Sequence, residues 1–266
     1  MPLDSLTGPA RRTPALAVAA LALALVGCGR AQPRVTVKGG PAPQEPPQRV
    51  SGNYKIDLYR APERDGTAVV VLVDTSGSMG QSVKDARGQV RPKYQIAREA
   101  LANIIRNTGA WQKAHPQALL NMGLYTFSSS VNEVLPIGEF DAARAEAALA
   151  RIPVPNSGTA IGHALEAGFK ALYRSGCRRK FLICVTDGEN TTGPQPDWIA
   201  RNLYGLTDGG VEMHFVAFDT AASRFAFLKD VNGQAVQADD GARLQNELNR
   251  IYEERILVEK EAEPGK

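Results

Sequence analysis

The sequence predicts an α/β fold: a doubly wound, mainly parallel sheet of six strands, with helices on both faces and one short antiparallel strand at an edge. Apolar runs of strand length alternate with segments of helical periodicity between about residues 51 and 260. Residues 68–73 (Ala-Val-Val-Val-Leu-Val) are apolar without interruption, which is typical of a strand buried on both faces. We expect residues 51–260 to form one domain, because a chain of this length suits a single core.

The remaining strands are predicted from apolar runs that end in turn residues. Residues 119–127 lead through three serines into residues 131–137, which indicates an antiparallel hairpin at the sheet edge. Residues 181–185 and 211–218 read as further buried strands, and Val236 marks a sixth.

Helices are predicted between the strands, where apolar residues recur at helical spacing. The first shared apolar face is formed by Tyr94, Ala97, Leu101, Ile104 and Ile105. The second is formed by Ile161, Ala164, Leu165, Gly168 and Leu172. Residues 141–152, 198–206 and 244–256 complete the set.

The first 27 residues have the layout of a secretory signal peptide. Arg11 and Arg12 precede an unbroken apolar run over residues 15–26. That run is shorter than the roughly twenty residues that a membrane-spanning helix needs. It ends in Leu-Val-Gly-Cys at residues 25–28, which resembles the bacterial lipobox. The resemblance implies cleavage before Cys28, lipidation of Cys28, and anchoring of the protein to a membrane by acyl chains.

The segments that flank the predicted domain are polar. Residues 28–50 are rich in proline and poor in apolar residues, so we expect a flexible linker there. Residues 261–266 form a tail. The lipid anchor places the protein in the cell envelope. Because Gly29, and not an aspartate, follows the cysteine, the outer membrane, facing the periplasm, is favoured if the cell has two membranes.

The other two cysteines are expected to be free. Cys184 lies within a predicted strand, and an extended chain would place Cys177 roughly 20 Å from it, which is beyond disulfide distance. The formal net charge of +3 is small and its charges are dispersed, which argues against a nucleic-acid partner.

Three short stretches carry hydroxyl and carboxylate groups beside predicted strand or helix ends. Asp74, Ser76 and Ser78 follow the first buried strand in the pattern Asp-x-Ser-x-Ser. Thr159 precedes a helix, and Asp187 follows the strand at 181–185 within Thr-Asp-Gly. Because the loops after parallel strands meet at one edge of a doubly wound sheet, these side chains should face one crevice.

Two carboxylates and three hydroxyls are hard oxygen ligands. Such a set suits Mg²⁺, Mn²⁺ or Ca²⁺, and suits zinc or copper poorly. Each residue also has an ordinary interpretation: Asp74 as a turn residue, Thr159 as a helix cap, and Asp187 as part of a turn. Found together, in this order and at strand ends, they favour a metal site.

The same residues resemble the metal-ion-dependent adhesion site (MIDAS) of von Willebrand factor type A domains, and the likeness covers about residues 68–256. The resemblance implies that Ser76 and Ser78 bind the ion through their hydroxyls. Thr159, Asp74 and Asp187 would bind it directly or through water. A sixth position would be filled by an acidic side chain of a protein partner.

Enzyme classes fit poorly. A phosphatase of the haloacid dehalogenase type needs a second aspartate where this chain has Ser76, and neither a Gly-x-Ser-x-Gly elbow nor a dinucleotide or Walker motif is present. The three histidines, at positions 115, 163 and 214, are expected to be structural. No histidine or lysine is expected near enough to activate a metal-bound water.

Metal-dependent protein binding at the membrane is therefore the predicted function. A metal-dependent envelope hydrolase and a structural module without metal-dependent binding are the alternatives. Residues 80–93 form a polar insertion beside the site, with Lys84, Arg87, Arg91 and Lys93 against Asp85. This insertion is either a determinant of partner choice or an exposed charged loop.

Overall fold

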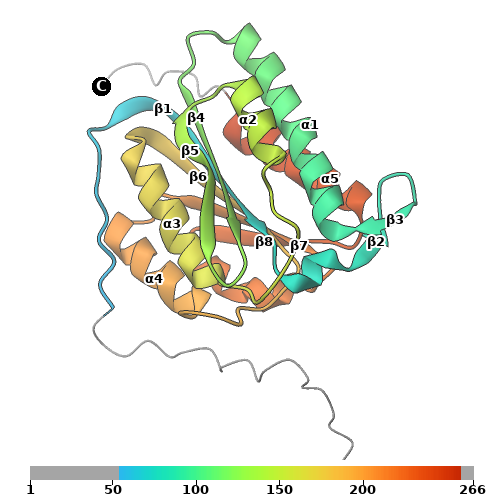
Figure 1. Ribbon diagram of the computed structural model, residues 1–266. Coiled ribbons are helices and arrows are strands. Elements are labelled where there is room, and N and C mark those ends of the chain that lie inside the picture. The colour runs from blue at the N-terminus through green and yellow to red at the C-terminus, as the bar shows by residue number, and fades with distance from the viewer. Residues whose placement is uncertain (1–53, 259–266) are drawn as a thin grey trace, which may run out of the picture. The chain divides into compact units, whose positions relative to one another are not determined.

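The computed structural model describes residues 54–258, which contain one six-stranded sheet in the order β5-β4-β1-β6-β7-β8 (Figure 1). Its parallel strands are β1 (Arg64–Asp74), β4 (Leu120–Phe127), β6 (Cys177–Thr186), β7 (Glu212–Phe218) and β8 (Gly233–Ala238). The edge strand β5 (Val131–Glu139) runs antiparallel to β4. The predicted fold class is confirmed. The predicted signal peptide, Cys28, the linker and the tail lie outside the described residues.

Five α-helices cover the two faces of this sheet. Helices α1 (Lys93–Ala114), α2 (Ala142–Leu149) and α5 (Gly241–Ile251) lie on one face, and α3 (Ile161–Arg174) and α4 (Pro196–Thr207) lie on the other (Figure 1). The helix predicted at 244–256 ends at Ile251 and continues as a π-helical turn, Tyr252–Ile256. Two 3-10 segments, η1 (Gly77–Gly80) and η2 (Ala222–Asp230), follow β1 and β7.

The strand order places a topological switch point at β1. From β1 the chain passes to β4 and β5 on one side and then to β6, β7 and β8 on the other. Asp74 is the last residue of β1, and Thr186 is the last residue of the neighbouring β6. Because ligands of doubly wound folds bind where the strand order reverses, this edge is the natural position for a site.

Residues 54–62, here called the N-terminal strap, lie extended across α3 and α4 (Figure 1). Tyr54, Ile56 and Leu58 alternate with exposed residues and pack half-buried on the core beneath. The Tyr54 hydroxyl donates to Glu166, and its ring meets Trp198 edge-on at 5.6 Å between centroids. At the other end, the N–H of Ala61 donates to the carbonyl of Tyr173 at 3.1 Å.

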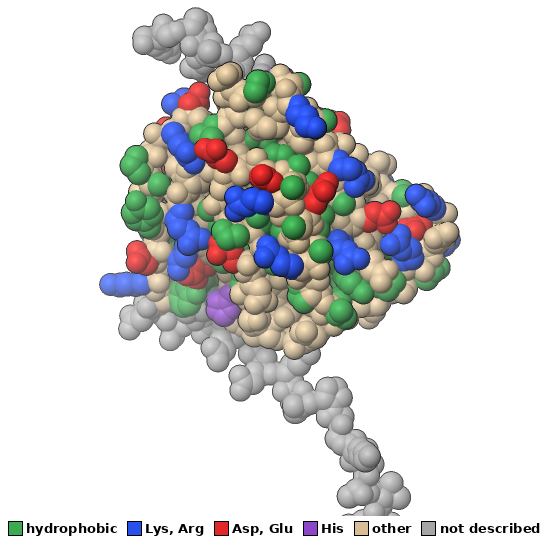
Figure 2. All heavy atoms as spheres, turned by 45° about the horizontal axis from the view of Figure 1, so that its top comes forward, with side chains coloured by type: hydrophobic (Ala, Val, Ile, Leu, Met, Phe, Trp, Pro, Cys, Tyr) green, Lys and Arg blue, Asp and Glu red, His purple; other side chains and the backbone are tan. Residues whose placement is uncertain are grey.

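Both predicted free cysteines are on β6, where they are buried and unpaired. Two residues of one extended strand cannot approach each other, so this prediction is confirmed. Within residues 54–258, no helix is long and apolar enough to cross a bilayer. On the face drawn in Figure 2, acidic and basic side chains are interspersed, which agrees with the small net charge.

Candidate functional site

The loop after β1 folds tightly around the Asp74 side chain. The N–H of Ser76 donates to Oδ1 of Asp74 at 2.7 Å, and the N–H of Gly77 donates to the carbonyl of Ser157 at 3.1 Å. Segment η1 then brings the hydroxyls of Ser76 and Ser78 to 3.1 Å from each other. All three predicted side chains of this loop therefore share one side of the turn.

The end of β6 joins this loop through its own polar side chains. The Thr186 hydroxyl donates to Oδ2 of Asp74 at 2.5 Å, and the Ser78 hydroxyl donates to Oδ1 of Asp187 at 2.7 Å. Residues more than a hundred positions apart in the sequence are thus directly bonded. The expectation that the loops after these two strands meet is confirmed.

Thr159 is held by the loop that follows Asp187. Its N–H donates to the Thr191 hydroxyl at 2.8 Å, and its carbonyl accepts from the N–H of Thr191 at 2.9 Å and of Thr192 at 3.2 Å. The interpretation of Thr159 as a helix cap is wrong, because Ala160 occupies the cap position of α3 and the N–H of Gly162 donates to Oδ1 of Asn190 at 3.3 Å. The Thr159 hydroxyl is therefore available for the site.

Gly188 reveals how closely these side chains converge. A methyl group placed on its Cα would lie 3.5 Å from Oγ1 of Thr159, 3.8 Å from Oγ of Ser78 and 3.9 Å from Oδ2 of Asp74. Glycine thus leaves open a small space lined by oxygen atoms. Ser76 and Asp187 adjoin this space through their contacts with Ser78. Together these two carboxylates and three hydroxyls fit a hard divalent cation.

Burial makes the Asp74 carboxylate costly to keep charged without a cation. Its side chain is fully buried, and this burial raises the pKa of Asp74 to about 6, although hydrogen bonds from Ser76 and Thr186 oppose the shift. The nearby Asp187 charge raises this pKa further. A bound cation would favour the charged form, so the local electrostatics suit a metal ion.

Lys93 occupies a position that the sequence analysis did not foresee. We placed Lys93 in the polar insertion beside the site, but it is the first residue of α1 and its side chain contacts a predicted ligand, Asp187. Its ammonium group lies 2.9 Å from Oδ2 of Asp187 and 2.9 Å from Oδ2 of Asp219, with 4% of its side chain exposed. Burial lowers the pKa of Lys93, but bonds to Asp219 and Asp187 outweigh that effect and leave the pKa above its ordinary value.

Asp219 is a second site residue that the sequence analysis missed. It directly follows β7, has a positive φ of 54°, and keeps 45% of its side chain exposed. The signal was present in the sequence, since a carboxylate directly after a buried strand had already identified Asp74. Applying the same rule to residue 219 would have added it.

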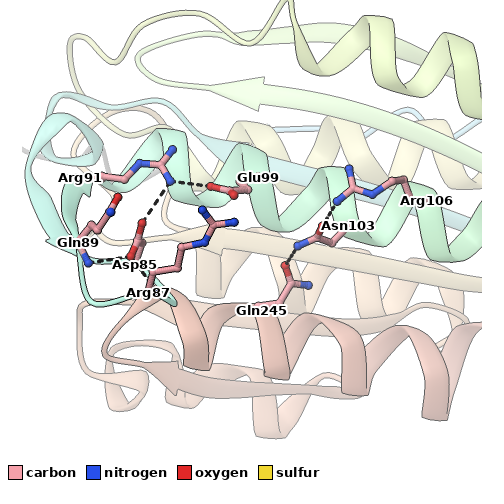
Figure 3. A network of polar contacts seen from close by, with 8 residues as sticks. All are labelled: Asp85, Arg87, Gln89, Arg91, Glu99, Asn103, Arg106 and Gln245. Atoms are coloured by element: carbon pink, nitrogen blue, oxygen red, sulfur yellow. Dashed lines mark hydrogen bonds and ion pairs between the residues drawn. The ribbon is translucent and has the colours of Figure 1, made fainter.

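The insertion at residues 80–93 is an ordered hairpin of β2 (Ser82–Lys84) and β3 (Val90–Pro92). Asp85 organises its turn: its Oδ1 accepts from the N–H of Arg87 at 2.9 Å and of Gln89 at 2.8 Å (Figure 3). Arg91 bridges Asp85 to Glu99 of α1, at 3.3 and 2.7 Å. The N–H of Lys93 donates to the carbonyl of Gln81 at 2.8 Å, which places Lys93 at the base of the hairpin.

We predict that the hairpin loses order in acid. Burial raises the pKa of Asp85, but hydrogen bonds from Gln89, Arg87 and Arg91 outweigh it, so the pKa lies below the ordinary value. A carboxylate with a lowered pKa stabilises the fold above its unfolded pKa of about 3.9, and this contribution is lost as the pH falls through the folded pKa. Hydrogen-exchange protection of the hairpin amides should therefore fall below about pH 4.

The Asp85→Ala variant tests the assignment, because its hairpin amides should be unprotected even at neutral pH. Asp65→Ala is a matched control, since that aspartate is 90% exposed and far from the hairpin in the sequence. Protection that is the same in wild type and Asp85→Ala at every pH would contradict the role of Asp85.

None of the three histidines contacts the five predicted ligands through a described hydrogen bond. The buried His214 on β7 faces Glu212, with 2.9 Å between Nε2 and Oε1. His115 stacks on Trp111 at the end of α1, at 4.6 Å between ring centroids. The ring of His163 lies against Gly193, which has a φ of +74°.

The sequence model of the von Willebrand factor type A domain matches residues 68–250, which is more than half of the chain. The chain belongs to the von Willebrand factor type A family. A comparison with curated proteins gives no match.

Three solved structures share the fold at low identity. BatB from Bacteroides thetaiotaomicron superposes with a TM-score of 0.56 at 17% identity, covering 71% of this chain and 98% of that one. The PilB minor pilin from Streptococcus sanguinis gives 0.58 at 14%, covering 76% of this chain and 63% of the pilin. Proximal thread matrix protein 1 from the mussel byssus, with a zinc-occupied MIDAS motif, gives 0.54 at 18%, covering 72% and 48%. This chain thus spans less than two thirds of the pilin and less than half of the byssus protein.

Proposed function

We propose that this chain is a membrane-anchored protein-binding module of the bacterial cell envelope. Binding would depend on a divalent ion, Mg²⁺ in the first instance or else Mn²⁺ or Ca²⁺, held by Asp74, Ser76, Ser78, Thr159 and Asp187. The observation that carries the proposal is the convergence of these side chains around the space beside Gly188. The byssus protein with a zinc-occupied MIDAS motif supports metal binding at such a site in this fold.

The ion would link the module to an acidic group. Asp187 is the only one of the two carboxylates that also contacts a described lysine, and Asp74 is already engaged by Ser76 and Thr186. A divalent ion among so few free negative charges keeps positive charge of its own. The acidic side chain of a protein partner would then complete its coordination shell.

Anchoring would come from lipid on Cys28 at the end of the signal sequence. The linker at residues 28–50, extended by its prolines at about 3.1 Å per residue, would hold the domain some tens of ångströms from the membrane. The outer membrane, on its periplasmic side, is the favoured location if the cell has two membranes.

Binding, and not catalysis, is the proposed role of the ion. Lys93 is paired with two carboxylates and holds its proton, so it is poorly suited to take a proton from water. The contacts made by His214 and His115 direct their rings to other parts of the domain.

Partner capture should require the divalent ion. The full-length protein, purified in detergent and immobilised, would be incubated with envelope extract in Mg²⁺, in EDTA, and in EDTA followed by excess Mg²⁺. We expect capture in the first and third conditions only. Thr159→Ala should weaken capture at least about tenfold, because it removes one oxygen ligand from the shell.

Thr108→Ala is the matched control for that experiment. The Thr108 hydroxyl is buried without a partner in α1, about 22 Å along the helix axis from Lys93. A parallel screen of phosphoester and ester substrates tests the hydrolase alternative. Capture that persists in EDTA, together with turnover that is lost in Asp74→Asn, would overturn the proposed function.

A further inference from the structure

The charge beside the site is arranged in an unusual way. Lys93 begins α1 with its ammonium group directed to the sheet edge, where it is almost completely buried. Taking an ammonium group out of water costs hydration free energy unless nearby carboxylates offset it. Here two carboxylates do so, those of Asp187 and Asp219, each at 2.9 Å.

Asp187 is therefore shared between two sets of contacts. Its Oδ1 accepts from the Ser78 hydroxyl at 2.7 Å, on the side of the predicted metal ligands. Its Oδ2 accepts from Lys93 at 2.9 Å. A positive charge already compensates this carboxylate before any ion arrives.

Asp219 contacts the same ammonium group as Asp187. The Asp219 side chain is 45% exposed, whereas the Asp187 side chain is 0% exposed. Asp219 therefore contacts the ammonium group from the solvent side, and Asp187 contacts it from the interior. If the charge of Asp219 were removed, Asp187 would be the only one of these two carboxylates still charged beside Lys93. Removing Lys93 would leave both carboxylates uncompensated.

We infer that Lys93 is a built-in cation that competes with the divalent ion for Asp187, and that Asp219 sets the strength of this competition. The inference rests on the proposed metal site and adds a regulating pair to it. It makes two substitutions act in opposite directions. If Lys93 merely held Asp187 in place, its removal would instead weaken metal binding.

The test measures Mg²⁺ and Mn²⁺ affinity by calorimetry on the full-length protein in detergent. Lys93→Met, which keeps the buried volume, should bind the ion at least about tenfold more tightly than wild type, because one repelling charge is gone. Asp219→Asn should bind it several-fold more weakly. Lys170→Met is the control, because it removes a half-exposed lysine that pairs with Glu166 on α3.

Melting temperature gives a second readout. Metal-free Lys93→Met should melt below wild type, because Asp187 stays buried without its cation, and saturating Mg²⁺ should raise its melting temperature more than that of wild type. If Lys93→Met does not fold, Asp219→Asn alone decides: an affinity equal to or above that of wild type overturns the inference. Weaker or unchanged binding by a folded Lys93→Met also overturns it.

The outcome for wild type separates this inference from the proposed function. If neither wild type nor Lys93→Met binds an ion, both fail. If only Lys93→Met binds one, the competition is real, and the proposed metal dependence of the wild-type protein is wrong.

Discussion

Replacing Asp74 by asparagine is expected to lower the affinity for Mg²⁺ or Mn²⁺ by at least about a hundredfold, because it removes one of the two carboxylates among the predicted ligands. The fold should survive. Asp74 ends β1 and is fully buried, so an isosteric residue is needed to test its charge without opening a cavity. Asparagine can still accept the hydrogen bond from Ser76 and can donate to the Thr186 hydroxyl.

Calorimetry on the full-length protein measures the affinity, and circular dichroism checks the fold. Asp208→Asn is the control for loss of one negative charge. That aspartate ends α4 with a φ of 50°, a conformation that asparagine adopts readily. If Asp74→Asn bound the ion as tightly as Asp208→Asn does, Asp74 would not be a ligand.

Replacing Cys28 by serine is expected to abolish lipidation, because the serine hydroxyl cannot form the thioether to which the lipid is joined. The wild-type protein should incorporate a clickable fatty acid and partition into detergent. The variant should do neither, and it should be released or remain unprocessed. The loss of label should be complete, and with it the stable anchoring that several acyl chains give.

Cys177→Ala controls for the loss of a cysteine, because that thiol is buried on β6 and is not available to a modifying enzyme. It should carry the label as wild type does. Fatty-acid label that persisted on Cys28→Ser would show that the lipid is attached elsewhere.

The sequence was sufficient to predict the order of strands and helices along the chain. It also predicted that the loops after the buried strands meet. Uninterrupted apolar runs such as residues 68–73 indicate buried parallel strands, and the loops after such strands must share an edge. This reasoning placed Asp74 and Asp187 together, and the bond from Ser78 to Asp187 agrees with it. Whether an ion binds there stays a prediction.

What the sequence could not reveal depended on the path of short polar segments. Lys93 reads as one of several cations in an insertion, because Asp85-Ala-Arg-Gly88 indicates a turn but not the pairing of the short segments on either side of it. The turn of this hairpin depends on Asp85, which accepts two backbone hydrogen bonds. These bonds become apparent only in the structure. The pairing of Tyr54 with Glu166 was hidden for a similar reason, since 112 positions separate them.

The N-terminal strap has a mechanical consequence. The chain enters the described domain at Tyr54, beside Trp198 in the first turn of α4, and crosses toward Tyr173 at the far end of α3 (Figure 1). Helix α4 begins after β6, so Tyr54 lies toward the sheet edge that carries the candidate site. If lipid holds the N-terminus and a partner pulls on that site, tension reaches the strap at Tyr54 first. Its contacts would be loaded one after another, as in peeling, and the strap would detach before the interior strands bear a load. Release of residues 54–62 would lengthen the tether by about 30 Å, at roughly 3.3 Å per residue. The strap would thereby limit the force that reaches the interior strands when the anchor and the partner move apart.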